Sequence, residues 1–550
     1  MNRCGYLVSL FLAVPMLACA GESDSGSAST IGGSSSQSVG GASVGSGGAI
    51  VGNSTGSTSM AKGGSKAVGG NSGSSVGLGG AQTSSGGSTN SSTSGGAGTA
   101  GAATGGKSAG GASSTGGVAA GGTSATGGTS SAIVESCDLS TVFSAFPVGF
   151  SLLTSGTRQF AAYYDANRQM TVASRTIGSC SWTKATLAST IGWDSHNYIA
   201  MDFDSDGYLH LAGNMHSSPL IYFKTSKPWD ITTFVKQTSM IGSNETQCTY
   251  PQFFHNASGE LIFMYRDGVS GNGNHYFNKY STTAKTWSRL LGSALTNGTA
   301  NNVNAYPVGP IQGPDNRWHL VWVWRETADA STNRDLSYAR TSDLVNWQKA
   351  SGQALTLPIT LTTSDIVDPV PTKSGMINNN TKVGFDAQNR PIVAYHKNDS
   401  NGYTQLCNAR FENGAWKVYK TSNWTSTWNF GGTGTLVFDI EVFPVELQAD
   451  GTLTQTWYNK NEGGLGAFRL NPTTLAAEAQ ISPPVPYPAE LAKVVSTYAN
   501  MGVRWQKDSG KSPDANTLYM LRWETLPSNR DLEVTPIPPA TALRLYGFRK

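Results

Sequence analysis

Four side chains that could exchange protons or bind a carboxylate occur within two short segments. His196 stands in the run Trp-Asp-Ser-His-Asn-Tyr, and His216 follows twenty residues later in Gly-Asn-Met-His. Tyr250 stands in Thr-Tyr-Pro-Gln, and Arg266 follows sixteen residues later in Tyr-Arg-Asp-Gly. Histidine changes charge near neutral pH, a tyrosine hydroxyl can give up a proton, and arginine binds carboxylates with two parallel hydrogen bonds. Together these residue types make an acid–base set with a carboxylate clamp.

This set suits β-elimination in a polysaccharide that contains uronic acid. The C5 proton of a uronic acid is only weakly acidic, and neutralising the adjacent carboxylate by Arg266 makes the carbanion accessible. A base with a pKa of about 7 then removes the proton, and an acid protonates the departing O4. A histidine suits the base, and Tyr250 or the second histidine suits the acid, so the residues alone leave the roles of His196, His216 and Tyr250 open. The reaction requires no cofactor.

Rival chemistries find less support in the sequence. It has no nucleophile-elbow Gly-x-Ser-x-Gly accompanied by the partners of that motif, and no convincing His-Glu-x-x-His or Cys-x-x-Cys metal motif. A glycoside hydrolase needs two facing carboxylates, and no spacing selects such a pair. The candidate carboxylates are Asp194, Asp202, Asp267, Asp368 and Glu441. Two alternatives stay open: a glycoside hydrolase or sialidase-like propeller, and a non-catalytic propeller that binds surface carbohydrate.

The elements that must position these residues are strands. From residue 160 onward, runs rich in Val, Ile, Tyr, Phe and Trp alternate with polar residues between short turns, and no helical period is sustained. One unit recurs, a polar turn followed by an apolar strand. Its seven copies begin at Asp165, Asp206, Ser258, Asp315, Gln388, Asp450 and Ala515. One copy for about every 60 residues of the range 132–550 predicts an all-β, seven-bladed β-propeller, with six or eight blades as alternatives.

Polar residues close equivalent apolar strands in consecutive copies of this unit. Aligning the copies on their turns brings Asn214, Arg266, Arg325 and His396 to the same strand end. Several such residues in equivalent places indicate a binding site at one mouth of the propeller. We therefore expect substrate contacts from four residues around the catalytic set: Asn197, Asn272, Arg325 and His396.

The first 131 residues differ in composition from the rest. Residues 1–18 combine Arg3 with a short apolar run, which predicts a secretory signal peptide. Ala18 followed by Cys19 resembles a bacterial lipobox, which implies a lipoprotein signal peptide with Cys19 as the lipidated residue. An ordinary signal peptide cut nearby is the alternative. Residues 19–131 are rich in Gly, Ser, Ala and Thr and contain no aromatic residue, so we expect a disordered tether. Ala20, rather than Asp, after the cysteine indicates an exported outer-membrane lipoprotein displayed at the cell surface, or a secreted protein.

Charge and cysteine content bound the partners. The 550 residues carry 38 Lys and Arg against 35 Asp and Glu, with no basic run, which disfavours nucleic-acid binding. No apolar stretch of about 20 residues follows the N-terminus, which excludes a polytopic membrane protein. We expect a monomer whose partners are an anionic polysaccharide and, through Cys19, the outer membrane.

Export permits a disulfide, for which Cys137–Cys180 within the first blade is the preferred pair, leaving Cys248 and Cys407 as buried thiols.

The sequence motifs around the four catalytic candidates resemble those of a known group of proteins. Trp-Asp-Ser-His-Asn, Met-His-Ser-Ser, Thr-Tyr-Pro-Gln and Tyr-Arg-Asp-Gly-Val-Ser-Gly-Asn-Gly are similar to BNR-repeat propellers that include the ulvan lyases of polysaccharide lyase families 24 and 25. The resemblance extends from about residue 150 to residue 470. It implies a seven-bladed propeller that cuts endolytically between sulfated rhamnose and a uronic acid. It also implies that His196 and His216 are the catalytic histidine pair, Tyr250 the catalytic tyrosine and Arg266 the arginine that neutralises the carboxylate. On this resemblance we expect His196 to be the base and Tyr250 the acid, although the two roles could be exchanged.

The same resemblance implies a structural metal ion, zinc or calcium. The candidate ligands in this sequence are His319, His396 and Cys407, although they show no tight ligand spacing.

Overall fold

The computed structural model describes residues 132–550, so the expectations for the signal peptide, Cys19 and the tether lie outside the described residues. Residues 132–550 are all-β, as expected, and consist of strands with a few single-turn 3-10 helices. No helix within this range is long and apolar enough to cross a membrane.

The strands form seven antiparallel sheets. The first sheet contains β2 (Ser151–Ser155), β3 (Arg158–Tyr164), β4 (Gln169–Thr176) and β5 (Thr183–Thr190). The second contains β6 (Ile199–Phe203), β7 (Leu209–Gly213), β8 (Tyr222–Thr225) and β9 (Phe234–Gln237). The third contains β10 (Cys248–His255), β11 (Leu261–Val269), β12 (Asn272–Ser281) and β13 (Thr286–Arg289). The next two are β14 (Asn304–Gln312), β15 (Trp318–Arg325), β16 (Asn333–Thr341) and β17 (Trp347–Gln348), with β18 (Asp365–Asp368) also on β16; and β19 (Lys382–Phe385), β20 (Pro391–Asn398), β21 (Thr404–Glu412) and β22 (Ala415–Lys420). The last two are β23 (Ile440–Leu447), β24 (Leu453–Asn459), β25 (Gly464–Leu470) and β26 (Ala477–Ile481); and β27 (Gly502–Lys507), β28 (Thr517–Thr525) and β29 (Thr541–Arg549) with β1 (Ile133–Val142). The 3-10 turns are Ile231–Thr233, Thr299–Asn301, Ala330–Thr332, Lys460–Glu462 and Ala489–Ala492.

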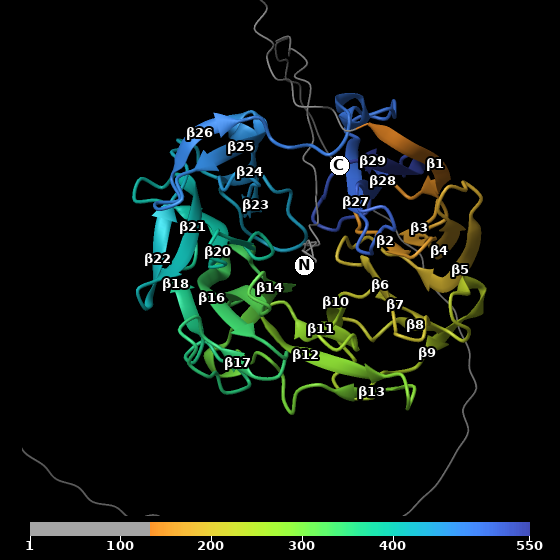
Figure 1. Cartoon of the computed structure of the whole chain (residues 1–550), viewed down its shortest axis with the longest axis horizontal. Helices are drawn as coiled ribbons and strands as arrows, with labels where there is room; N and C mark the ends of the chain where they lie inside the picture. Colours follow the sequence, from red (N-terminus) through yellow and green to blue (C-terminus); the bar gives the residue numbers. More distant parts are fainter. Residues whose placement is uncertain (1–131) are drawn as a thin grey trace, which may run out of the picture. The chain divides into compact units, whose positions relative to one another are not determined.

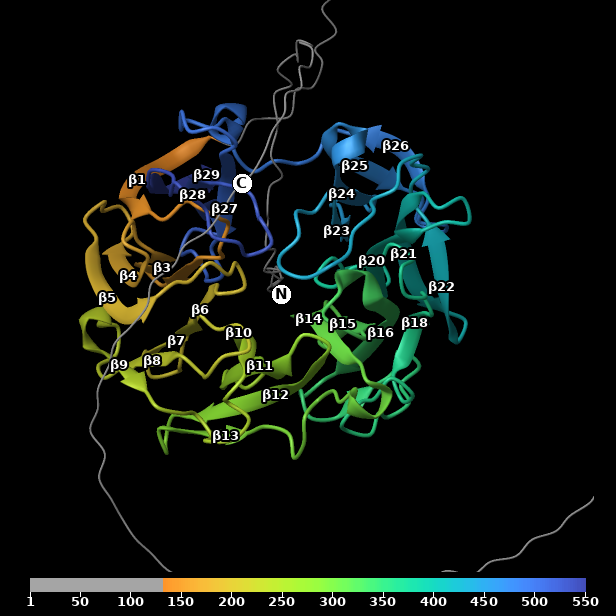
Figure 2. The same ribbon diagram turned by 180° about the vertical axis from the view of Figure 1, so that it is seen from behind.

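The sheets follow one another around a common centre (Figures 1 and 2), with the first strand of each sheet towards the centre and the last at the rim. Each sheet contains one of the seven turns found in the sequence. Six of these turns join the first and second strands of their sheets. The turn at Asp165 instead joins β3 to β4, the second and third strands, so the first copy of the repeat is one hairpin out of step with the others.

The two ends of the described chain meet in one sheet. β1 pairs antiparallel with β29, with Cys137 opposite Leu545, and so completes the sheet that β27 and β28 begin. β1, the first strand of the described chain, is therefore the outermost strand of the last sheet, which we call the closing sheet. Backbone hydrogen bonds between the two ends of the described chain close the ring of sheets.

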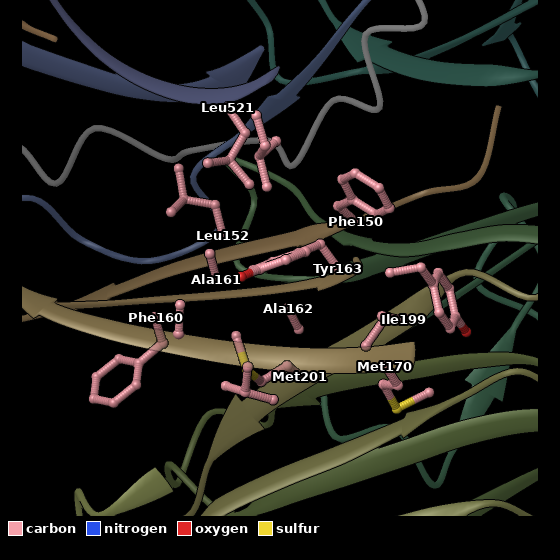
Figure 3. Close-up of a cluster of buried hydrophobic side chains, with 14 of the residues drawn as sticks. Phe150, Leu152, Phe160, Ala161, Ala162, Tyr163, Met170, Ile199, Met201 and Leu521 are labelled. Atoms are coloured by element: carbon pink, nitrogen blue, oxygen red, sulfur yellow. The ribbon is translucent and has the colours of Figure 1, made fainter. Parts of the chain in front are cut away.

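The hydrophobic core lies between neighbouring sheets. Phe150 stacks on Trp523 at 4.5 Å between ring centres, and Phe160 meets Phe203 edge-on at 4.9 Å, so the contacts join three sheets. Figure 3 shows Phe150, Leu152 and Leu521 gathered in this cluster. A sheet covered on both faces favours continuous apolar runs over strict alternation, which is why all of β3 except Arg158 is buried.

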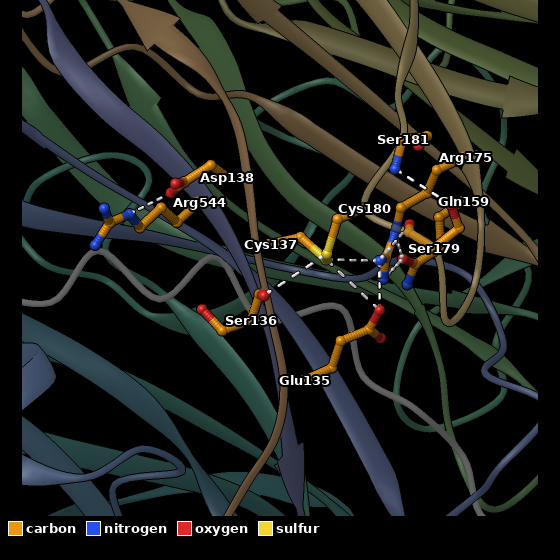
Figure 4. The surroundings of a disulfide bond; sticks show 10 residues. All are labelled: Glu135, Ser136, Cys137, Asp138, Gln159, Arg175, Ser179, Cys180, Ser181 and Arg544. Carbon is orange, nitrogen blue, oxygen red and sulfur yellow. Dashed lines mark hydrogen bonds and ion pairs between the residues drawn. A yellow bond between two sulfur atoms is a disulfide. The ribbon is translucent and has the colours of Figure 1, made fainter.

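The expected disulfide between Cys137 and Cys180 is present, with 5.3 Å between the two Cα atoms (Figure 4). The reason given for it was wrong: Cys137 lies on β1 in the closing sheet, whereas Cys180 lies between β4 and β5. The bond therefore joins two consecutive sheets. Arg175 packs beside it and donates hydrogen bonds to Glu135 at 2.5 Å and to Gln159 at 2.6 and 2.8 Å. The other two cysteines of this range, Cys248 and Cys407, are free and buried, as expected.

Candidate active site

A single carboxylate holds the two candidate histidines together. Asp194 accepts a hydrogen bond from Nδ1 of His196 through Oδ1 at 2.7 Å, and from Nδ1 of His216 through Oδ2. The two imidazole rings stack, with centres 4.1 Å apart and planes inclined by 21°. Burial raises the pKa of Asp194, but the hydrogen bonds and charges of both histidines outweigh it and hold the pKa well below its usual range. Asp194 is therefore ionised at neutral pH.

The β6–β7 hairpin explains why histidines twenty residues apart meet. Ile199 at the start of β6 pairs with Gly213 at the end of β7. His196 lies three residues before Ile199 and His216 three residues after Gly213, so both side chains come to the same end of the hairpin. The Tyr164 hydroxyl fixes the approach to β6 by donating to the carbonyl of Asn197 at 2.6 Å.

Tyr250 reaches the histidines because β10 is bulged. Its φ angle is +58°, and the pairing of β10 with β11 shifts register between Thr249 and Gln252. Pro251 lies in this interval and cannot donate a hydrogen bond to a neighbouring strand. The Tyr250 ring approaches that of His196 edge-on, with 5.8 Å between the ring centres.

Arg266 lies opposite Thr249 on β11 and is fully buried. Its Nη2 donates to the hydroxyls of Thr249 at 2.9 Å and Ser217 at 3.2 Å. Its guanidinium lies 5.1 Å from the centre of the Tyr250 ring and 5.7 Å from that of Tyr306. Within residues 132–550, its Nε and Nη1 have no hydrogen-bond partner.

A glycine on the neighbouring strand leaves room for this arginine. Gly273 on β12 faces Arg266, and a Cβ atom at this position would lie 3.0 Å from Cδ of Arg266. This gives a packing reason for the last glycine of the Gly-Val-Ser-Gly-Asn-Gly segment.

Two phenols at the site titrate differently. Burial raises the pKa of Tyr250 to about 12, against the opposing charge of Arg266. Burial also raises the pKa of Tyr306, but the charges of Arg266 and Arg325 and two hydrogen bonds outweigh it, so the net shift is downward. Tyr250 therefore keeps its proton at neutral pH and can act as an acid.

The sequence reasoning missed the role of Asp194 as a bridge, and it missed Tyr306 altogether. Tyr306-Pro307 in β14 repeats the Tyr250-Pro251 pair of β10, and both strands are the first in their sheets. This repeated Tyr-Pro pair was the signal that could have identified Tyr306.

The remaining expected substrate ligands lie at different distances from this centre. Arg325 lies 5.5 Å from the centre of the Tyr306 ring, but its guanidinium donates to Thr327 O at 2.9 Å, to Ala328 O and to Asn378 Oδ1 at 3.4 Å. Asn272 is exposed in the hairpin beside Gly271, whose amide donates to the Tyr306 hydroxyl at 3.3 Å. Asn197 is buried.

His396 lies buried, 5.3 Å from the centre of the Trp428 ring, and burial lowers its pKa to about 4. It does not join the cluster around Asp194 in the described part of the chain.

The three candidate metal ligands do not come together. Both ring nitrogens of His319 are engaged, Nδ1 with the Tyr338 hydroxyl at 2.6 Å and Nε2 with Asp315 at 2.9 Å. Burial raises the pKa of the Cys407 thiol to about 12, which disfavours a thiolate ligand. His319, His396 and Cys407 therefore do not fit a metal ion. Within residues 132–550, ligand atoms within 4.8 Å of one another occur at the disulfide with Glu135 and at Asp194, His196 and His216.

Comparison with known proteins agrees with this architecture. Residues 158–424 match the BNR repeat-containing family. A curated protein, "Ulvan lyase, short isoform" from Alteromonas sp. (strain LOR), is 29% identical over 126 residues. That match covers 21% of this chain and 24% of the relative, so the similarity spans about a quarter of that protein.

Two solved structures share the fold. The polysaccharide lyase Uly1 superposes with a TM-score of 0.54 over 76% of this chain and 99% of its own, at 12% identity. An ulvan lyase of polysaccharide lyase family PL25 gives a TM-score of 0.51 over 74% and 94% of the two chains, also at 12% identity. At this identity the likeness establishes the fold alone. Residues 158–424 are thus similar to a BNR repeat-containing family, and the chain resembles the ulvan lyases, as its sequence motifs indicate.

Proposed function

We propose that this protein is a polysaccharide lyase that cleaves a uronic-acid-containing glycan by β-elimination on a seven-bladed propeller, with each sheet forming one blade. The observation that carries the proposal is the pair of stacked histidines held by Asp194 beside the protonated Tyr250. A base and an acid thus lie next to each other.

Asp194 sets the proton positions on the histidines. An ionised carboxylate only accepts hydrogen bonds, so the proton of each neutral imidazole lies on Nδ1 and the lone pair on Nε2. We assign His196 as the base that removes the C5 proton through Nε2. His216 shares the carboxylate and is the alternative base.

Tyr250 protonates the departing O4, since its raised pKa keeps the hydroxyl protonated. The buried charge of Arg266 favours the negative charge that develops on the uronate carboxylate when C5 loses its proton. The unpaired Nε and Nη1 of Arg266 are donors that a carboxylate would satisfy. Direct contact requires a covering side chain to move as the substrate enters, because Arg266 is fully buried.

We propose a sulfated, ulvan-like polymer of rhamnose and glucuronate or iduronate as substrate. The curated relative is named an ulvan lyase, and one PL25 ulvan lyase structure, with a TM-score of 0.50 and 12% identity, is described as bound to -[GlcA(1-4)Rha3S]-. We further propose that the enzyme is monomeric and exported, either anchored through Cys19 at the outer membrane or secreted.

The test is the ultraviolet absorbance of the unsaturated uronide, followed over time with the purified protein on ulvan and a panel of other uronic-acid polymers. Elimination creates a conjugated double bond, which neither hydrolysis nor binding produces. Tyr250→Phe and His196→Ala should each lower kcat by about 10²-fold or more, since each removes a proton-transfer group. Tyr403→Phe, at an exposed tyrosine of another sheet, is the matched control and should retain full activity.

Other products would redirect the assignment. New reducing ends without absorbance would indicate a hydrolase, and binding without any product would indicate a carbohydrate-binding propeller.

A further inference from the structure

A hollow of about 450 Å³ lies beside the segment that carries Asp194 and His196. Two loops line it, and the lining residues that matter here are Trp428, Phe430, Thr435, Val437, Asn529 and Arg530. Its volume falls in the range of small-ligand sites. The loops lie outside residues 158–424, which match the BNR repeat-containing family, so this hollow is built by a part of the chain that the family match does not cover.

Direct hydrogen bonds tie this hollow to the active site. The Thr435 hydroxyl lies 3.2 Å from Nδ1 of His196. The Asp531 carboxylate accepts the Ser195 amide at 3.2 Å and the Thr435 amide at 2.8 Å. Asp531 therefore fixes both loops against the segment that carries the proposed base.

The lining offers the groups that recognise a charged sugar. Arg530 is exposed, and of its guanidinium nitrogens only Nη1 hydrogen-bonds within residues 132–550, to the carbonyls of Gly431 and Thr433 at 3.0 Å each. Arg530 forms no ion pair in the described part of the chain, so its remaining donors are available to an anion. The carboxylate of the lining, Asp439, is balanced by Lys460 at 3.4 Å.

Neutral parts of the lining complement a sugar ring. Phe430 is half-buried against Trp428, with 4.7 Å between the ring centres, and presents an aromatic surface to the hollow. Oδ1 of Asn529 is buried and has no hydrogen-bond partner within residues 132–550. A sugar hydroxyl would satisfy this acceptor.

A second hollow of about 280 Å³ continues along the same aromatic wall. It shares Trp428 and Phe430 with the first and adds Lys373, an exposed cation without an ion pair among residues 132–550. Two hollows on one wall, each with one available cation, match a polymer that carries repeated negative charges.

From these observations we infer that the hollow at Arg530 is a subsite for an anionic sugar of the polysaccharide, outside the bond that is cleaved, with the hollow at Lys373 holding the sugar beyond it. Arg530 binds the sulfate ester or carboxylate, Phe430 packs on the ring and Asn529 accepts a hydroxyl. This inference rests on the proposed lyase function.

The experiment compares Arg530→Ala in the full chain with wild type and with Arg469→Ala, an exposed arginine on β25. On the polymer that wild type cleaves, Arg530→Ala should raise KM by about five- to thirty-fold, because a charged hydrogen-bond partner is lost, while kcat changes little. Arg469→Ala should match wild type. Loss of the effect on desulfated polymer identifies sulfate as the bound group, and an undiminished effect on desulfated polymer identifies the carboxylate. A wild-type KM in Arg530→Ala would overturn the inference.

Arg530→Ala also removes the hydrogen bonds to the carbonyls of Gly431 and Thr433 and could loosen that loop, so a second variant tests the subsite with Arg530 in place. Asn529→Asp keeps the side-chain size and places a negative charge in the hollow, so it should raise KM and become less defective as salt screens the charge. An unchanged KM in this variant would also overturn the inference. If wild type cleaves no polymer, the proposed function fails, and the subsite is then judged by retardation of the protein in gels containing sulfated polymer. Weaker retardation of Arg530→Ala supports the subsite, and equal retardation overturns it.

Discussion

At the scale of single residues, Asp194 is the centre of the site. One carboxylate accepts Nδ1 of both His196 and His216, which fixes two ring orientations at once. A folded-state pKa below the ordinary value means that this ionised carboxylate stabilises the fold above its unfolded pKa. The stabilisation is lost only as the pH falls through the lower folded value. The arrangement is therefore intact throughout the neutral range.

We expect Asp194→Asn to lower kcat by about 10²-fold or more, because an amide NH2 replaces one carboxylate oxygen and donates where that oxygen accepts, so that one imidazole must change its tautomer or turn. KM should change much less. Initial rates across pH 5–9 would measure the effect, with circular dichroism to check the fold. Asp450→Asn, in an exposed turn, is the control. A full rate in Asp194→Asn would show that the bridge does not set the tautomers.

At the scale of elements, two hairpins and a bulge bring the site together. The β6–β7 pairing aligns the histidines, and the register shift in β10 aims Tyr250 at them. The β11–β12 hairpin carries Arg266 against Gly273, which has no side chain to displace it. Small backbone features of these five strands therefore decide the positions of the four candidate catalytic side chains.

We expect Gly273→Ala to lower kcat/KM by about tenfold, because the added Cβ would lie only 3.0 Å from Cδ of Arg266 and would push its guanidinium out of place. Stability should fall by about 1–3 kcal/mol, as in other overpacked sites. Steady-state kinetics and urea unfolding would measure the two effects. Gly292→Ala, where a Cβ meets nothing within 4 Å, should leave both unchanged. Wild-type kinetics in Gly273→Ala would mean that Arg266 tolerates displacement.

At the scale of the whole described unit, closure depends on its two chain ends. β1 completes the sheet of β27–β29, and the Cys137–Cys180 bond fastens β1 to the next sheet. The closing sheet and its neighbour share the core contacts of Phe150 with Trp523. β1 is the outermost strand of its sheet, and Cys180 lies just before β5, the outermost strand of the next sheet. We therefore expect both features to affect stability before activity.

Replacing both Cys137 and Cys180 by Ser should lower the free energy of unfolding by about 4 kcal/mol, the chain-entropy value for a separation of 43 residues. Initial kcat should stay at the wild-type level. Urea unfolding with and without a thiol reductant is the measurement. The reductant should shift wild type towards the double variant and leave the variant unmoved. A shift of the variant would place the redox-sensitive contact elsewhere.

Acid should destabilise the fold through buried histidines. Burial lowers the pKa of His275 to about 3 and of His396 to about 4, so below their unfolded value of 6.5 the unfolded chain binds protons that the folded chain does not. Stability is therefore lost as the pH falls below 6.5, by about 2 kcal/mol per histidine at pH 5. His396→Gln should remove its share of the difference between pH 7 and pH 5, measured by urea unfolding. His255→Gln, at a partly exposed histidine, is the control. An unaltered pH dependence in His396→Gln would assign the acid sensitivity to other groups.

Short sequence motifs were sufficient to group His196, His216, Tyr250 and Arg266 as one candidate site, and the structure brings these four side chains together. Seven turns in the sequence correspond to one turn in each of seven sheets, because a turn and the strand that follows it are local features. The repeat assignment slipped at Asp165 for the same reason, since successive hairpins of one sheet look alike over short windows.

Contacts between distant segments were decided only by the tertiary structure. The sequence gives no sign that Thr435 and Asp531 reach Ser195, or that Arg266 is buried behind Tyr250, because such contacts depend on how the sheets close around their centre. The expected metal ligand His319 is occupied by neighbours that its own strand does not reveal. Residue types and spacing determine the available chemistry and the strand pattern. Burial, pKa and the walls of a binding site arise from groups that are far apart in the chain and adjacent only after folding.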